Sequence, residues 1–271
     1  MKHEPAVILP VYAGDDPRYF AEALESVLCQ LPSGGLLLVV ADGPVGPWFD
    51  ELVPAPGQGV EILRLETNQG LAVALNTGVE RVLGLGYSFI ARMDADDRML
   101  PGRLKSQAEF LRENPTADIV GCAIVEINAA GESTGKVVRY PGTHEACLRF
   151  FRFRDPLAHP AVMFRDTWFR KAGMYDPSFR KNQDTELWYR GFLHGCRFAN
   201  LQDVFLEYRM TPGLYRSRRG GWQRARQLLA LRGRINRGLG YGPEAWIVAL
   251  GMAGLSLMPA FLRKLAYRFL R

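Results

Sequence analysis

The sequence lacks the two glycine-rich motifs that most often mark nucleotide-binding folds. It contains no Gly-x-Gly-x-x-Gly fingerprint and no Walker-type lysine loop, which argues against a dinucleotide-dependent dehydrogenase and against a P-loop enzyme. Cysteine is scarce as well, since the four cysteines among 271 residues follow no metal-ligand spacing. The start of the chain has no apolar stretch typical of a signal peptide. We therefore expect reduced thiols and a cytosolic protein.

Negative charge is almost absent from the last part of the chain. From Gly213 onward there are twelve Lys and Arg against one acid, Glu244, a net charge of +11 that leaves −5 for the preceding residues. A nucleic-acid-binding domain would spread positive charge over its folded face, so nucleic acid is not an expected partner. A mildly acidic body with a basic tail instead favours contact between the tail and an anionic membrane surface.

Strand and helix patterns alternate over the first 140 residues. Such βα units predict an α/β fold with a mostly parallel central sheet, helices on both faces and a ligand crevice beyond the carboxyl ends of the strands. Pro10 is expected to end the first strand, and Asn68 to cap a helix. Strands are expected at residues 6–9, 36–41, 60–65, 87–93 and 119–125, and helices at 17–30, 71–82 and 101–113. Later elements are a helix at 143–151, a helix at 184–195 and strands near 198 and 205–210.

Three carboxylates, Asp94, Asp96 and Asp97, follow the predicted strand at residues 87–93. Side-by-side carboxylates repel one another unless a cation neutralises them, and a hard divalent ion such as Mg²⁺ or Mn²⁺ prefers oxygen ligands. The cluster therefore predicts a metal site at a strand end. The alternative is a polar turn in which Asp97 caps the helix that begins near Pro101.

Seven short phrases occur in an order that resembles family 2 glycosyltransferases of GT-A fold, specifically the bacterial enzymes of exopolysaccharide, capsule and lipopolysaccharide synthesis. The resemblance covers roughly residues 5–210. Each phrase is weak alone, and their order carries the resemblance. The phrases are Ile8-Leu-Pro-Val-Tyr12, Ala41-Asp-Gly-Pro44, Asn68-Gln-Gly-Leu71, Arg92-Met-Asp-Ala-Asp-Asp97, His159-Pro160, Ala172-Gly173 with Tyr175-Asp176, and Gln183-Asp-Thr-Glu-Leu-Trp188.

The resemblance implies a role for each matching residue on the donor side. Asp42 lies near the base of the donor nucleotide, Asp94 faces its ribose, and Asp96 holds the metal that bridges its two phosphates. Pro10, Tyr12 and Asn68 complete the nucleoside pocket. The metal neutralises the charge that builds on the leaving diphosphate as the sugar–phosphate bond breaks.

On the acceptor side the resemblance makes Asp184 the general base, which takes the proton of the attacking hydroxyl. Gln183 stands where the family commonly has Glu, a departure that leaves the base in place. His159, Gln183 and Trp188 are possible contacts to acceptor or donor. Two alternatives stay open at this point, because Asp184 also suits a helix cap and Trp188 also suits a core position.

We expect a catalytic domain over residues 1–212 and a basic amphipathic helical tail over residues 213–271. Residues 222–237 alternate basic and apolar positions, and residues 245–262 carry no charge. We expect this tail to embed in the membrane interface with its last basic residues on anionic lipid. Packing of two helices on the catalytic body is the alternative, and spanning the bilayer is less favoured because the apolar stretch is short.

The predicted function is inverting, Mn²⁺- or Mg²⁺-dependent transfer of a sugar from a nucleotide-diphospho-sugar to a glycan hydroxyl. The acceptor is expected on a polyprenyl-diphosphate carrier, and the protein on the inner face of the cytoplasmic membrane as a peripheral cytoplasmic protein. The alternative is a membrane-attached scaffold or binding protein with a non-catalytic transferase-like domain. The presence of Asp94, Asp96 and Asp184 speaks against this alternative, and hydrolysis or transfer from a panel of sugar nucleotides would distinguish the two.

Overall fold

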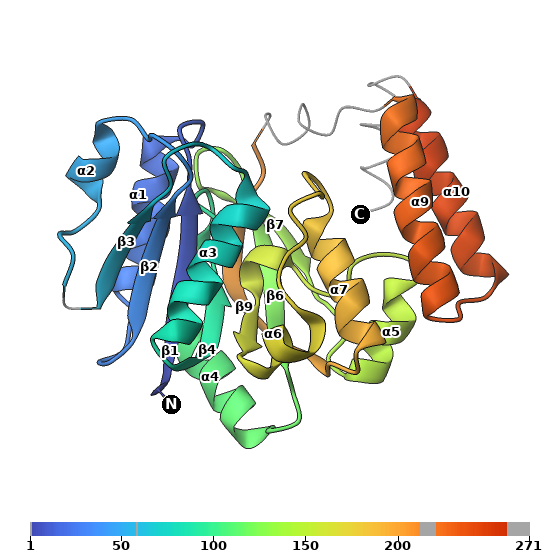
Figure 1. Cartoon of the computed structure of the whole chain (residues 1–271), viewed down its shortest axis with the longest axis horizontal. Coiled ribbons are helices and arrows are strands. Elements are labelled where there is room, and N and C mark those ends of the chain that lie inside the picture. The colour runs from blue at the N-terminus through green and yellow to red at the C-terminus, as the bar shows by residue number, and fades with distance from the viewer. Residues whose placement is uncertain (1, 58, 212–220, 259–271) are drawn as a thin grey trace.

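The computed structural model describes residues 2–57, 59–211 and 221–258. In these residues nine strands form one sheet, and the helices lie around it (Figure 1). The strands are β1 (Lys2–Val11), β2 (Leu36–Ala41), β3 (Val60–Arg64), β4 (Tyr87–Arg92), β5 (Arg98–Met99), β6 (Ile119–Ile127), β7 (Ser133–Val138), β8 (Met163–Arg165) and β9 (Phe198–Arg209). The helices are α1 (Pro17–Leu28), α2 (Trp48–Leu52), α3 (Leu71–Gly84), α4 (Arg103–Glu113), α5 (His144–Phe151), the 3₁₀ turn η1 (His159–Ala161), α6 (Thr167–Ala172), α7 (Gln183–Leu193), α9 (Trp222–Gly238) and α10 (Pro243–Leu257).

The strand order places a crevice at the end of β1. The order is β3-β2-β1-β4-β8-β6-β9-β5, with β7 paired to β6. Strands β3, β2, β1 and β4 are parallel, and β8 is antiparallel to both β4 and β6. From β1 the chain passes to β2 and β3 on one side of β1 and then returns to β4 on the other side of β1. The connections therefore diverge beyond the carboxyl ends of β1 and β4 and leave a crevice there. The predicted α/β class is confirmed.

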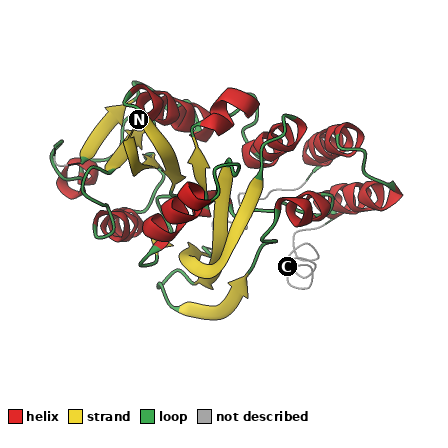
Figure 2. Ribbon diagram, turned by 90° about the horizontal axis from the view of Figure 1, so that it is seen from below, coloured by secondary structure: helices red, strands yellow, loops and turns green. Residues whose placement is uncertain are grey.

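Two hydrophobic cores lie on opposite faces of the sheet. All six residues of β2 are buried, as a strand covered on both faces requires, and successive side chains point into different cores. One core joins the sheet to α3, α6 and α7, and the other joins it to α1, α2 and α4. The sheet is therefore the middle layer, with helices on either side (Figure 2).

Strand β1 runs past Pro10 to Val11, so the expectation that Pro10 ends it is wrong. The carbonyl of Ile8 accepts a hydrogen bond from Met93 N, and the pairing of β1 with β4 stops at Ile8 and Arg92. Pro10, two positions on, points its nitrogen to the same side, where no partner strand remains. Its missing N–H therefore breaks no ladder hydrogen bond, and the strand continues through its pairing with β2.

Neither predicted helix cap is present. Gly70, at φ 94°, precedes α3 in place of Asn68, and left-handed Gly102 precedes α4 in place of Asp97. In addition, the two strands expected near residues 198 and 205–210 are one strand, β9. Its parallel register against β6 shifts between Cys122 and Ile124, which accounts for the interrupted sequence pattern.

Helices α9 and α10 lie side by side at one end of the molecule, next to α5 and α7 (Figure 1). Leu231 and Ile235 of α9 are buried in the same core as α7. The Arg232 Nη1 donates to the carbonyl of Phe151 at 2.8 Å. No helix among the described residues is long and apolar enough to cross a bilayer. Residues 213–220 and 259–271 of the predicted tail, including its last basic residues, lie outside the described part of the chain.

Candidate active site

Two cavities meet at Asp94. The β1 cavity, of about 280 Å³, lies beyond the end of β1. The β6 cavity, of about 310 Å³, lies beside β6, β7 and α7. Asp94 and Leu71 line both cavities. All six predicted donor and metal residues line the β1 cavity, namely Pro10, Tyr12, Asp42, Asn68, Asp94 and Asp96.

Asp42 fixes the loop that leads into α3. Its Oδ1 accepts a hydrogen bond from Gln69 N at 2.7 Å and its Oδ2 accepts one from Gly70 N at 2.8 Å. Asn68 Nδ2 donates to the carbonyl of Asp42 at 3.2 Å. Gly43 allows this close approach, because a Cβ there would lie 2.5 Å from Asn68 N. Asp42 and Asn68 thus shape one wall of the β1 cavity by holding the backbone.

Asp15 also lines the β1 cavity and was not predicted from the sequence. Its Oδ2 accepts a hydrogen bond from Tyr12 N at 2.9 Å. Burial raises the pKa of Asp15 to about 7, and the charges of Asp96 and Asp94 add to the rise. The neighbouring Asp16 is the side-chain cap of α1, accepting from Arg18 N at 2.9 Å.

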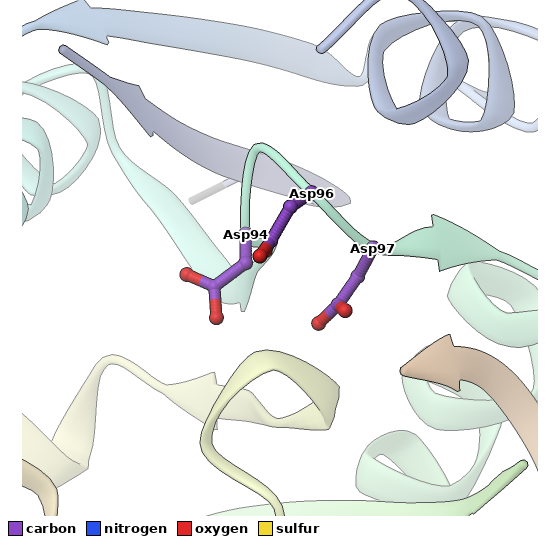
Figure 3. Close-up of side chains that lie close together, drawn as sticks. All are labelled: Asp94, Asp96 and Asp97. Carbon is purple, nitrogen blue, oxygen red and sulfur yellow. The ribbon is translucent and has the colours of Figure 1, made fainter. Parts of the chain in front are cut away.

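The three carboxylates after β4 lie on one loop (Figure 3), and one oxygen from each falls within 4.8 Å of the others. Asp94 is already paired, because both of its oxygens accept from the guanidinium of Arg92, with Nη1 to Oδ2 at 2.9 Å. Arg92 is 3% exposed. A buried bidentate pair of this kind orients the carboxylate and neutralises it. The sequence contained Arg92 in the matching phrase but gave no reason to assign it this role.

The ionised forms of Asp96 and Asp97 are disfavoured without a cation, and burial, followed by the charges of Asp96 and Asp94, raises the pKa of Asp97 well above its ordinary value. Burial, followed by the charge of Asp94, raises the pKa of Asp96 to about 6. Asp97 is buried, and its Oδ1 accepts from Arg209 N at 2.8 Å. Its Oδ2 has no hydrogen-bond partner among the described residues. Two closely spaced carboxylates with an orphaned oxygen fit a hard divalent cation, so Asp96 and Asp97 are the residues that would hold one.

Arg209 holds this acidic loop from the end of β9. Its Nε donates to the carbonyl of Asp96 at 2.8 Å, and its side chain is fully buried. The guanidinium also pairs with Glu22 of α1 and lies 4.2 Å from the centre of the Tyr19 ring. The loop is therefore anchored to β9 and α1, which are far from it in the sequence.

Asp184 lines the β6 cavity, in the first turn of α7. The residue at the cap position is Asn182, with φ 60°, so the alternative reading of Asp184 as the cap is wrong. Burial raises the pKa of Asp184 to about 6, and the charge of Asp155 contributes further. Asp155 Oδ2 in turn accepts a hydrogen bond from the Thr185 hydroxyl at 2.9 Å. A carboxylate with a pKa near neutrality suits proton transfer.

The other predicted contacts divide between the cavity and the core. His159 and Gln183 line the β6 cavity, and Gln183 Oε1 is buried without a hydrogen-bond partner among the described residues. His159 Nε2 lies 2.9 Å from the Tyr175 hydroxyl, and burial holds the pKa of His159 well below its usual range. Trp188 is fully buried and lines neither cavity, so it packs in the core.

The arrangement suits transfer between two bound molecules. The β1 cavity has backbone and side-chain groups for a nucleotide and an acidic loop for a cation. The β6 cavity presents a carboxylate of raised pKa. The two share Asp94, so a group carried by a molecule in one cavity would face a molecule in the other. Together with a sheet whose parallel half opens at its switch point, this is the arrangement expected of an enzyme that transfers a group from a bound nucleotide.

The chain belongs to glycosyltransferase family 2, whose family model, Glycosyl transferase family 2, matches residues 6–208. It is 33% identical over 213 residues to the O-antigen biosynthesis glycosyltransferase WbnJ of Escherichia coli, covering 76% of this chain and 79% of that one. It is 30% identical over 217 residues to the amylovoran biosynthesis glycosyltransferase AmsE of Erwinia amylovora, covering 79% of each. The predicted family is confirmed.

A further relative names its substrates. It is the UDP-Gal:alpha-D-GlcNAc-diphosphoundecaprenol beta-1,3-galactosyltransferase of Escherichia coli, 25% identical over 218 residues, which cover 80% of this chain and 77% of that one. Among solved structures, S. aureus TarS 1-349 in complex with UDP-GlcNAc is similar in fold. It has a TM-score of 0.63 at 18% identity, and the match covers 94% of this chain and 82% of that one.

Proposed function

We propose that this chain transfers a sugar, with inversion, from a nucleotide-diphospho-sugar to a hydroxyl of a glycan acceptor. The observation that carries the proposal is the shared wall at Asp94 between the β1 cavity and the β6 cavity. The nucleotide occupies the β1 cavity, and its sugar extends past Asp94 toward Asp184. Asp184 accepts the proton of the acceptor hydroxyl as that oxygen attacks from the opposite face of the sugar.

A divalent ion, Mn²⁺ or Mg²⁺, belongs to this proposal. Asp96 and Asp97 hold it, and when bound it neutralises negative charge on the departing diphosphate. Asp94 faces the ribose, and its pairing with Arg92 keeps both of its oxygens in one orientation. Pro10 and Tyr12 line the side of the cavity at the end of β1, while Asp42 and Asn68 line the side at α3.

A screen of UDP-, GDP- and dTDP-sugars tests the donor class. We expect one nucleotide to raise the melting temperature, with a larger rise when Mn²⁺ is present, because a ligand that binds only the folded state stabilises it by mass action. Calorimetry then gives the affinity. If no nucleotide sugar binds with or without metal, the proposed donor is wrong, and the alternative of a non-catalytic scaffold replaces it.

The acceptor proposed here is linked to a polyprenyl diphosphate, and the protein works on the inner face of the cytoplasmic membrane. The support is the named acceptor of the galactosyltransferase relative and the outer face of α10. This helix carries no charged residue after Glu244. An apolar helix is normally covered on all sides, but four of its apolar residues are exposed and form the α10 stripe: Trp246, Ile247, Leu250 and Leu257.

Replacing Ile247 and Leu250 of the α10 stripe with glutamate is expected to release the protein from anionic vesicles. These side chains are 70% and 63% exposed, so the change adds no strain to the fold. Each apolar side chain buried in the interface contributes about 1.5–3 kcal/mol, so the double variant should lose on the order of 10²-fold or more in partitioning. Sedimentation with phosphatidylglycerol vesicles measures this.

The matched control for the α10 stripe is Val137→Glu on β7, which is also exposed, at 39%. It adds one negative charge, where the double variant adds two, on a different element and should leave vesicle binding unchanged. Equal vesicle binding by the double variant and the unaltered protein would contradict membrane contact through α10. Thermal unfolding of every variant verifies that the fold is intact.

A further inference from the structure

The β6 cavity is lined by three cations, Arg92, Lys136 and Arg154, and by three carboxylates, Asp94, Glu126 and Asp184. Residues 136–154 contain five Lys and Arg against one acid, Glu145. Two of these cations, Lys136 and Arg154, line the cavity itself. The rest of the catalytic body is acidic overall, so residues 136–154, called the basic wall here, are a positively charged segment beside this cavity.

Among the described residues, Arg154 is the cation lining the cavity that no carboxylate neutralises, because Arg92 pairs with Asp94 and Lys136 pairs with Glu126. Its side chain is half-buried, and its Cζ lies 5.8 Å from the centre of the Phe150 ring. In the described part of the chain it forms no ion pair, since the adjacent Asp155 accepts from Thr185 and lies 3.8 Å from Arg232. A guanidinium held at a cavity offers a planar fork of N–H donors that matches phosphate oxygens.

Lys136 provides a second positive charge from β7. Its Nζ lies 3.4 Å from Glu126 Oε1, and this ion pair positions the ammonium at the cavity. An ammonium has three donors, so one ion pair leaves donors for a ligand. Lys136 is partly compensated by Glu126, and Arg154 is not. We therefore expect Arg154 to contribute more to anion binding than Lys136.

The basic wall lies next to the elements that hold the C-terminal helices. Arg154 comes three residues after α5, whose Leu148 carbonyl accepts a hydrogen bond from the Tyr241 hydroxyl at 2.5 Å. Arg152 Nη1 pairs with Glu244 of α10 at 2.8 Å. A chain of contacts thus runs from α10 through α5 to Arg154 and the cavity of Asp184. An acceptor anchored in a membrane at α10 would pass this wall.

We propose that Arg154 and Lys136 form an anion subsite for the phosphate of the acceptor, so that the substrate is a glycosyl phosphate or diphosphate. The inference rests on the proposed function and deepens it, because it distinguishes a phosphorylated acceptor from a neutral glycan. The acceptor hydroxyl lies at Asp184, and its phosphate lies on the Arg154 side of the same cavity. The subsite binds acceptor only, so nucleotide affinity is independent of it.

The test uses the full chain with saturating nucleotide and Mg²⁺, titrated with undecyl diphosphate in a calorimeter. The nucleotide is the one that binds most tightly among UDP, GDP and dTDP. Arg154→Gln should weaken undecyl diphosphate binding on the order of tenfold or more, the cost of one charge-assisted hydrogen bond. Lys136→Gln should weaken it less. Arg170→Gln, which removes an exposed arginine paired with Asp166, is the matched control and should change nothing.

A second arm separates the acceptor phosphate from lipid headgroups, which share its chemistry. The proposal requires that Arg154→Gln lose diphosphate affinity while its sedimentation with phosphatidylglycerol vesicles stays normal. Normal diphosphate affinity in Arg154→Gln overturns the proposal, whether or not vesicle binding falls. Displacement of undecyl diphosphate by the nucleotide also overturns it, because the probe would then occupy the β1 cavity.

Failure of this inference and failure of the proposed function give different results. Nucleotide affinity and slow hydrolysis of the nucleotide sugar depend on the β1 cavity and Asp184. If both are normal and Arg154→Gln has no effect, the anion subsite is wrong and the transferase stands. If no nucleotide binds to the unaltered chain, the donor proposal fails, and undecyl diphosphate binding without nucleotide still tests Arg154.

Discussion

Replacing Asp184 with asparagine is expected to lower kcat by roughly 10²–10⁴, the ordinary contribution of a general base. The amide keeps the size of the side chain but cannot take a proton from the acceptor hydroxyl. Asp184 lines the β6 cavity and not the β1 cavity, so donor affinity should stay near normal. Single-turnover transfer and calorimetric donor binding, measured on the same preparation, separate the two effects. A near-normal kcat would remove Asp184 from the role of base.

The pH dependence of kcat gives an independent check of the same residue. Asp184 accepts a proton only when ionised, and its pKa is raised to about 6. The rate should therefore be nearly constant above this pH and fall about tenfold per pH unit well below it. Saturating Mn²⁺ is required, because Asp96 also has a pKa of about 6 when no cation is bound.

Two variants with opposite expected shifts test whether Asp184 causes the fall in kcat at low pH, called the acidic limb of the profile. Asp155→Asn removes a negative charge that raises the pKa of Asp184 but keeps an acceptor for the Thr185 hydroxyl, so the limb should move to lower pH. Gln183→Glu adds a negative charge beside Asp184, so the limb should move to higher pH. If both variants leave the limb in place, another group controls it.

Replacing Asp96 with alanine is expected to abolish the part of donor affinity that depends on metal. Asp96 lines the β1 cavity with its carboxylate in the acidic loop. A direct ligand should matter at least as much as an outer-shell partner, whose loss costs about 10- to 100-fold. Calorimetry with the nucleotide sugar in Mn²⁺ and in EDTA measures the difference. Donor affinity in Mn²⁺ equal to that of the unaltered protein would exclude Asp96 as a ligand.

Asp97→Asn and Asp203→Ala complete this experiment. Asp97→Asn keeps an acceptor for the Arg209 N–H but loses negative charge, so a fall in metal affinity identifies Asp97 as a second ligand. Asp203 is an exposed acid on β9, and its replacement should leave metal affinity unchanged. Thermal unfolding shows whether a variant has lost its fold instead of its ligand.

Much of the fold followed from local patterns. Runs of apolar residues such as residues 36–41 predict a strand buried on both faces, and the structure has β2 at these residues. Parallel strands joined by helices imply a crevice at their carboxyl ends, which is why Tyr12, Asp42 and Asp94 were predicted to meet. They meet in the β1 cavity. These predictions succeeded because the spacing of apolar residues and the direction of a strand are both set by a few neighbouring residues of the chain.

Other predictions failed where a side chain finds a distant partner. The alternative in which Asp97 caps a helix is wrong, because Asp97 bonds to Arg209, 112 positions later. Asn68 was predicted as a cap, but its side chain bonds to the backbone of Asp42. Gly70 occupies the cap position of α3 instead. Cap preferences are local and weak, so a tertiary contact overrides them, and no short-range pattern signals this.

The sequence by itself determined the class of fold, the family and which acids form the candidate site. Periodic apolar positions and short motifs in a fixed order can be recognised directly in the sequence. Only the tertiary structure decided how those acids are used. It paired Asp94 with the buried Arg92 and left one oxygen of Asp97 without a partner among the described residues. It also raised the pKa of Asp184 by burial beside Asp155 and set Arg154 at the same cavity. Desolvation and Coulombic interaction depend on burial and on distances in space, and positions along the chain do not fix either.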